Sequence, residues 1–133
     1  MEAGDQPSDS ARPRPPCVLI VFRRPPFGSV MAVEGLRMAE ALLAFQVPVK
    51  VVFTEDGVLC LLEGQGKGAL GMGDLGKAFA GLPSMGLSRM MVVKEDLEGR
   101  GLSPGDLVEA PITMIPACQL RKEMEEANVV IPF

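Results

Sequence analysis

Two apolar, β-branched runs separated by a helix-length amphipathic stretch constrain the fold of this chain most strongly. The runs cover residues 17–22 and 49–54, and the stretch between them covers residues 30–46. Strands joined through a helix run parallel, because the crossover returns the chain to the same end of the sheet. Binding sites in open parallel sheets form beyond the carboxyl ends of the strands. We therefore expect a βαβ unit with candidate sites in loops 23–29 and 55–57.

The rest of the chain continues this alternation. Further strands are expected at residues 87–93, 111–115 and 129–131, and helices at residues 74–82, 96–101 and 117–127. Ser29 and Asp74 are the expected N-terminal caps of two helices, and Gly101 is an expected left-handed end of a third. Such alternation predicts a three-layer α/β/α sandwich with a mostly parallel sheet of about five strands. Right-handed crossovers then place helices on both faces.

The first residues differ from the rest. Residues 1–16 contain four prolines and no periodic apolar pattern, which predicts a disordered leader before a single domain at 17–133. The acidic start does not resemble a signal peptide, and no apolar run approaches the roughly 20 residues that cross a bilayer. We expect a cytoplasmic protein without membrane contact.

Composition excludes several classes of function. The chain has no histidine, which removes Ser–His and Cys–His hydrolase chemistry, and it has no Cys-x-x-Cys pair for zinc. We expect no metal and no cofactor. The net charge is −4 and the only basic tract is Arg23-Arg24, so direct nucleic-acid binding is not expected. The mean hydropathy of +0.25 is high for a monomer of this size and predicts apolar surface buried between subunits.

One glycine-rich stretch matches a nucleotide-binding pattern. Residues 71–76 read G-x-G-x-x-G, and Lys77 completes the glycines and lysine of a P-loop. A phosphate site needs a strand that runs directly into the glycine turn, whereas residues 63–70 read as loop. Ala78 also stands where a magnesium-binding hydroxyl is required. The stretch is better explained as a flexible loop.

The three cysteines are the candidate reactive groups. Cys17 begins the first strand and Cys60 is flanked by leucines, so both read as packed thiols. Cys118 lies at the start of the last helix, where the helix dipole favours a thiolate. A structural role is favoured for all three. If one of them reacts, Cys118 and Cys60 are the candidates.

The two strand-end loops carry the other candidate residues. The first contains Arg23, Arg24, Gly28 and Ser29 before a helix N-terminus, and it reads equally as an anion site or as a solvated turn stiffened by prolines. In the second loop, Glu55 and Asp56 form an acidic turn, which more often caps a helix than performs chemistry.

These loops also carry a family resemblance. Residues 21–29 (VFRRPPFGS), 34–36 (EGL), 53–59 (FTEDGVL), 96–102 (DLEGRGL) and 129–133 (VVIPF) resemble the DsrE/DsrF group of small sulfur-relay proteins, and its DsrF/TusC branch in particular. The resemblance runs from about Val18 to the C-terminus. It implies a role in passing persulfide sulfur toward tRNA 2-thiolation or within sulfur oxidation.

The resemblance also implies the role of this chain within the sulfur relay. Sulfur-carrying members that resemble DsrE have a cysteine at the end of the third strand, shortly before an Arg-Gly pair. Here that pair is Arg100-Gly101 and Val93 aligns with the cysteine, with no cysteine anywhere from Met90 to Arg100. The resemblance therefore implies an accessory subunit that assembles with two related small proteins into a hetero-hexamer. Enzymatic activity extends at most to carrying a persulfide.

Two other functions fit the residues. One is a regulatory module that binds a small ligand or nucleotide through loops 23–29 and 55–57. The other is a homo-oligomer that assembles without related partners.

Overall fold

The structure is a computed structural model that describes residues 16–28, 30–64 and 74–133. The expected leader, Pro16 excepted, and most of the glycine-rich loop lie outside these ranges. The elements in chain order are β1 (Val18–Phe22), α2 (Met31–Ala44), β2 (Val49–Phe53), η1 (Glu55–Leu61), α3 (Leu75–Ala80), η2 (Leu82–Met85), β3 (Arg89–Val93), α4 (Lys94–Glu98), η3 (Pro104–Asp106), β4 (Ile112–Ile115), α5 (Ala117–Glu126) and β5 (Val129–Pro132).

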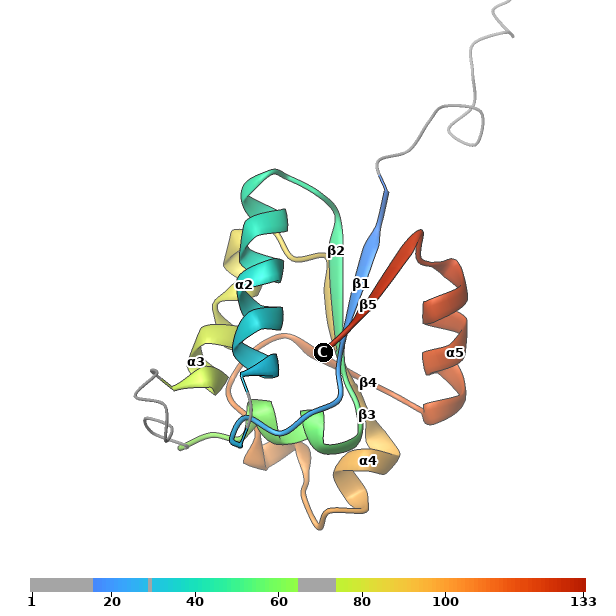
Figure 1. Cartoon of the computed structure of the whole chain (residues 1–133). Helices are drawn as coiled ribbons and strands as arrows, with labels where there is room; N and C mark the ends of the chain where they lie inside the picture. The colour runs from blue at the N-terminus through green and yellow to red at the C-terminus, as the bar shows by residue number, and fades with distance from the viewer. Residues whose placement is uncertain (1–15, 29, 65–73) are drawn as a thin grey trace, which may run out of the picture.

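The sheet confirms the expected fold class. Its five strands run in the order β4-β3-β2-β1-β5, and every neighbouring pair is parallel. Helices α2 and α3 cover one face and α5 covers the other (Figure 1). The first crossovers step from β1 toward β4, whereas the last one returns from β4 to β5. When all crossovers have the same handedness, that reversal of direction places α5 on the opposite face of the sheet.

Strand β1 is the centre of the core. All five of its residues are buried, because β1 lies between β2 and β5 and has helices on both faces. The larger apolar cluster lies on the α2 and α3 side. The smaller cluster lies under α5 and contains Leu19, Val21, Val52, Met91, Val93 and Ile115. In the part of the chain that the structure describes, no helix is long and apolar enough to span a membrane.

Helix ends agree with the sequence in part. Asp74 caps α3 as expected, since its Oδ1 accepts a hydrogen bond from the Lys77 amide at 3.2 Å. Helix α2 has Val30 at its N-cap and no side-chain cap, while Ser29 lies outside the described residues. The short helix expected at 96–101 begins two residues earlier, as α4. Gly101 is the left-handed residue after it, with φ of 70°.

The side chain of Phe22 joins several elements at the end of β1. Its ring stacks on Phe53 with centroids 5.0 Å apart and meets Phe79 edge-on at 4.9 Å. The ring of Phe133 stacks on it at 6.2 Å. On the backbone side, a Cβ at Gly57 would collide with the carbonyl oxygen of Phe22. Turn η1 can therefore lie against β1 only with glycine at position 57.

The substitution Gly57→Ala tests this close approach. The added methyl meets backbone, which cannot rotate away, so we expect a loss of about 1–3 kcal/mol in the free energy of unfolding. Urea denaturation measures it. Gly105→Ala is the matched control, because the nearest atom to its Cβ is 3.8 Å away. Equal stability of the two variants would contradict the packing described for η1.

Candidate functional site

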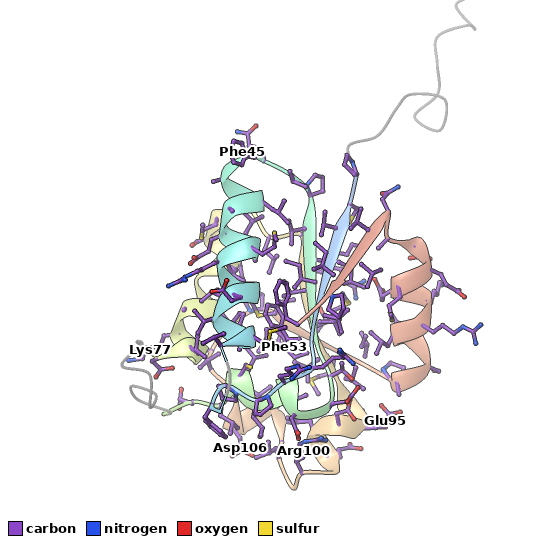
Figure 2. The ribbon with its side chains drawn as sticks, in the orientation of Figure 1. Phe45, Phe53, Lys77, Glu95, Arg100 and Asp106 are labelled. Atoms are coloured by element: carbon purple, nitrogen blue, oxygen red, sulfur yellow. The ribbon has the colours of Figure 1, made fainter. Side chains whose placement is uncertain are left out.

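The carboxyl ends of the strands meet at one edge of the sheet, which we call the carboxyl edge. Loop 23–28 follows β1, turn η1 follows β2, α4 follows β3 and α5 follows β4. Figure 2 shows Glu95 and Arg100 together at this end of the molecule, beyond Phe53. The edge therefore combines residues from four separate parts of the sequence.

Asp96 organises the junction between β2 and α4. Its Oδ2 accepts a hydrogen bond from the Thr54 hydroxyl at 2.6 Å and another from the Glu55 amide at 2.8 Å. Glu55 has a positive φ of 52°, a conformation that side-chain-bearing residues rarely adopt. The carboxylate of Asp96 thus holds the backbone of this acidic turn, and the Glu55 residue is exposed to solvent.

Arg100 binds the second acid of the turn. Its Nε and Nη2 both donate to Oδ1 of Asp56, at 3.1 and 2.9 Å, and its Nη1 donates to the carbonyl oxygen of Asp96 at 3.0 Å. Asp56 therefore takes part in a tertiary ion pair. Thr54, Asp96 and Arg100 are not among the candidate site residues that the sequence pattern predicts. The available signal was the i,i+4 spacing of Asp96 and Arg100 directly after a strand.

The arginine loop is exposed and carries positive charge. Arg23 and Arg24 both face solvent, and within the described ranges no acidic side chain pairs with either guanidinium group. Gly28 has a φ of 84° and open space around it. The loop is attached to η1 through its backbone, since the Cys60 thiol donates to the Arg24 carbonyl oxygen at 3.5 Å.

Cys60 is a buried thiol with a raised pKa. It is completely buried, and desolvation raises its pKa from 9.0 to about 12. Because the thiolate is the nucleophilic form, this thiol is almost entirely in the inactive state at neutral pH. The structure therefore supports the packing role that the flanking leucines indicated.

Cys118 is exposed on the first turn of α5. However, Oε1 of Glu95 accepts a hydrogen bond from the neighbouring Ala117 amide at 2.8 Å. A carboxylate therefore already binds one of the free backbone amides at the N-terminus of α5. Cys60 belongs to the core on the α2 side, so the structure does not bring the two candidate cysteines together. Cys17 is half-buried at the start of β1.

Val93 stands at the position where the resemblance implies a cysteine in sulfur-carrying members. It is the last residue of β3, is 1 % exposed, and pairs with Ile115 of β4. The α5-side cluster surrounds it. An apolar side chain thus fills the point at the carboxyl edge where a carrier thiol would lie.

The described residues offer little support for metal or phosphate binding. No group of three potential metal ligands occurs among them. Residues 71–73 of the glycine stretch lie outside the described ranges, and α3 is a six-residue helix whose N-terminus is occupied by the carboxylate of Asp74. A phosphate at that helix end would meet an anion in its place.

Fold and edge together define a small three-layer α/β protein in which the apolar Val93 ends β3 at the carboxyl edge. A sequence model of the DsrE/DsrF-like family matches residues 17–133, and the chain belongs to this family. The intracellular sulfur oxidation protein DsrF of Allochromatium vinosum is 29% identical over 124 residues, which cover 84% of this chain and 91% of that protein. The TusC homolog of Pseudomonas aeruginosa is 35% identical over 114 residues, covering 86% of this chain and 95% of that protein.

Solved structures agree with this fold. The ychN protein of Escherichia coli superimposes with a TM-score of 0.77 at 22% sequence identity, covering 89% of this chain and 99% of that one. Protein MTH1491 of Methanobacterium thermoautotrophicum gives a TM-score of 0.66 at 17% identity, covering 88% and 98%. At these identities the likeness establishes the fold alone.

The raised pKa of Cys60 predicts a pH dependence of stability. Below pH 9.0 both the folded and the unfolded thiol hold a proton, and the full contribution of the buried thiol is present. Between 9.0 and about 12 only the unfolded state releases the proton, so the free energy of unfolding falls with rising pH. The slope is at most about 1.4 kcal/mol per pH unit. Cys60→Ala should lose this slope in urea denaturation between about pH 8 and 10.5, whereas Cys118→Ala should keep it. Equal slopes for the original chain and Cys60→Ala would contradict the assignment.

Proposed function

We propose that this chain is an accessory, non-catalytic subunit of a sulfur relay that passes persulfide sulfur between proteins. Two relatives, an intracellular sulfur oxidation protein DsrF and a TusC homolog, support a role in a sulfur relay. Membership of the DsrE/DsrF-like family over residues 17–133 supports a role as one of its subunits. The relay would serve either sulfur oxidation or tRNA 2-thiolation. We place it in the cytoplasm, without direct contact of this chain with nucleic acid.

The buried Val93 is the observation that carries this proposal. A sulfur carrier needs an accessible thiolate where donor and acceptor can both reach it. At the carboxyl edge after β3 this chain offers an isopropyl group that is 1 % exposed. Cys60 is unavailable because burial keeps it protonated. The chain therefore contributes binding surface rather than sulfur chemistry.

The charged residues of the edge fit such a supporting role. Asp96, Asp56 and Glu95 are each bound by donors of the same chain, namely Thr54, Arg100 and the Ala117 amide. These contacts fix the loops after β2, β3 and β4 relative to one another. A rigid edge presents Arg23, Arg24 and Glu55 to a partner in a constant arrangement, and related small relay subunits are the partners we propose.

Cys118 is the basis of a second candidate function, because it is an exposed thiol. Its thiolate would attack the outer sulfur of a donor persulfide, form a Cys118 persulfide and release the donor as a thiolate. This step conserves atoms and electrons without a further oxidant. The carboxylate of Glu95 at the adjacent helix end argues against it.

Intact-protein mass spectrometry after exposure to a persulfide donor separates the two functions. With thiol alkylation and peptide mapping, we expect no stoichiometric added sulfur on Cys118 or Cys60 under conditions that load a known carrier. The treated Cys118→Ser variant should show the same added masses as the treated original chain, apart from the change at position 118. Stoichiometric sulfur on Cys118, lost in Cys118→Ser, would replace the accessory role with a carrier role.

Retention of a phosphate ligand through purification would instead favour a ligand-binding module.

A further inference from the structure

The two faces of the sheet are covered in different ways. Helix α2 contributes six buried residues to its interface with the sheet, and α3 adds Leu75 and Phe79 to the same apolar cluster. On the opposite face, within the described part of the chain, the covering helix is α5 alone (Figure 1). The one residue that α5 buries is an acid, Glu123. Helix α5 therefore lacks the broad apolar stripe that holds α2 in place.

Glu123 is the one buried charged side chain among the residues that the structure describes, with 5 % of its surface exposed. Its Oε2 accepts hydrogen bonds from Nη1 of Arg89 at 3.1 Å and from Nε2 of Gln119 at 3.3 Å. Its Oε1 lies 3.7 Å from Nζ of Lys50 and accepts no hydrogen bond from the described residues. The buried carboxylate thus depends on two cations of the sheet, and one of its oxygens is only partly compensated.

The two cations are direct neighbours on the sheet. Lys50 of β2 is in register with Arg89 of β3, so both side chains leave the sheet on the same face and at the same level. Two residues further along each strand, Val52 and Met91 belong to the smaller apolar cluster on that face. Like charges side by side on a sheet are unfavourable. Docking of α5 brings the carboxylate of Glu123 to both of them, and we call these three residues the α5 ion cluster.

The remaining contacts of α5 are few. Leu120 and Ala127 are partly buried and pack on the smaller apolar cluster, whereas Met124 is 40 % exposed. At the start of the helix, the Ala117 amide donates to Oε1 of Glu95. An isolated helix of ten residues is marginal in water. Helix α5 therefore stays helical only while it is docked, and its docking depends largely on charge.

We propose that the α5 ion cluster is an electrostatic latch, and that α5 opens from the sheet as a separate unit when the cluster is weakened. A buried carboxylate that loses one partner is left uncompensated, which destabilises the docked helix far more than the loss of an exposed ion pair would. In the open state the smaller apolar cluster becomes accessible to solvent, while the larger cluster under α2 stays covered. This local opening does not depend on the relay function.

The alternative is that the three charges stabilise the whole domain, and that α5 opens only on global unfolding. Amide hydrogen exchange followed residue by residue distinguishes the two cases, because it measures local and global opening separately. Residues 121–127 report on α5 and residues 36–43 on α2. In the unchanged chain, we expect the amides of α5 to be less protected than those of α2.

Arg89→Met removes one cation and keeps a long side chain at the same position. Exchange in α5 should accelerate about 10- to 100-fold, because Glu123 then keeps only its longer contact with Lys50. Exchange in α2 should stay unchanged. Arg37→Met is the matched control, since Arg37 pairs with Glu34 on the exposed surface of α2. Lys50→Met should act in the same direction as Arg89→Met with a smaller acceleration, which keeps the test available if Arg89→Met does not fold.

Replacement of the whole cluster should have the opposite effect. In the combined variant Lys50→Met, Arg89→Met and Glu123→Leu, no charge has to be buried when α5 docks. Well-packed apolar residues in place of a buried ion pair are often neutral or stabilising. We therefore expect exchange in α5 to be no faster than in the unchanged chain, and well below that of Arg89→Met.

Salt provides an independent test of the role of charge. The side chains of Lys50 and Arg89 are 28 % and 36 % exposed, so counter-ions can reach them. Raising NaCl from about 0.1 M to about 1 M shortens the screening length from about 10 Å to about 3 Å. Exchange in α5 should then accelerate about two- to fivefold in the unchanged chain, and the combined apolar variant should not respond.

Three results would overturn the latch. Equal protection of α2 and α5 in the unchanged chain would show that α5 does not open by itself. Acceleration of both helices to the same extent by Arg89→Met would assign the cluster to global stability. A combined apolar variant whose α5 opens as readily as in Arg89→Met would show that charge does not control docking. These experiments involve no sulfur donor or partner, so their outcome leaves the relay proposal untouched.

Discussion

The packing around Phe22 is the interaction on which the rest of the structure depends. Its ring contacts Phe53, Phe79 and Phe133, and a Cβ on Gly35 of α2 would press against it. Strands β1, β2, helices α2 and α3 and the last residue thus share one contact region. The carbonyl oxygen of the same residue borders Gly57. The carboxyl edge therefore packs directly on the aromatic cluster of the core.

The carboxyl edge is a network of contacts within the chain rather than a reactive centre. The carboxylates of Asp56, Glu95 and Asp96 are each bound by donors of the same chain, and the last residue of β3 is an apolar side chain. Of the three cysteines, one is buried with a raised pKa, one is half-buried and one lies beside a capping carboxylate. All of these features indicate that the residues of the carboxyl edge have a structural role. Loops fixed in this way are suited to holding a partner.

The sequence predicts the fold well, because local pattern decides it. The runs at 17–22 and 49–54 became β1 and β2, and the interval of helical periodicity became α2. The ion network of the edge could not be predicted in the same way. Thr54 and Asp96 are 42 residues apart, and their contact follows from the adjacency of β2 and β3 in the sheet. Likewise, a cysteine at a helix start indicates a favoured thiolate, but only tertiary structure reveals the carboxylate of Glu95 nearby.

A reconstituted sulfur relay tests the accessory role most directly. The chain would be combined with its related subunits, a persulfide donor and an acceptor, once unchanged and once with Cys17, Cys60 and Cys118 replaced by alanine. Complex assembly by both forms, checked by mass, is the condition for comparing rates. The account predicts equal rates of sulfur delivery to the acceptor. Loss of delivery by an intact cysteine-free complex, with recovery when Cys118 alone is restored, would contradict it.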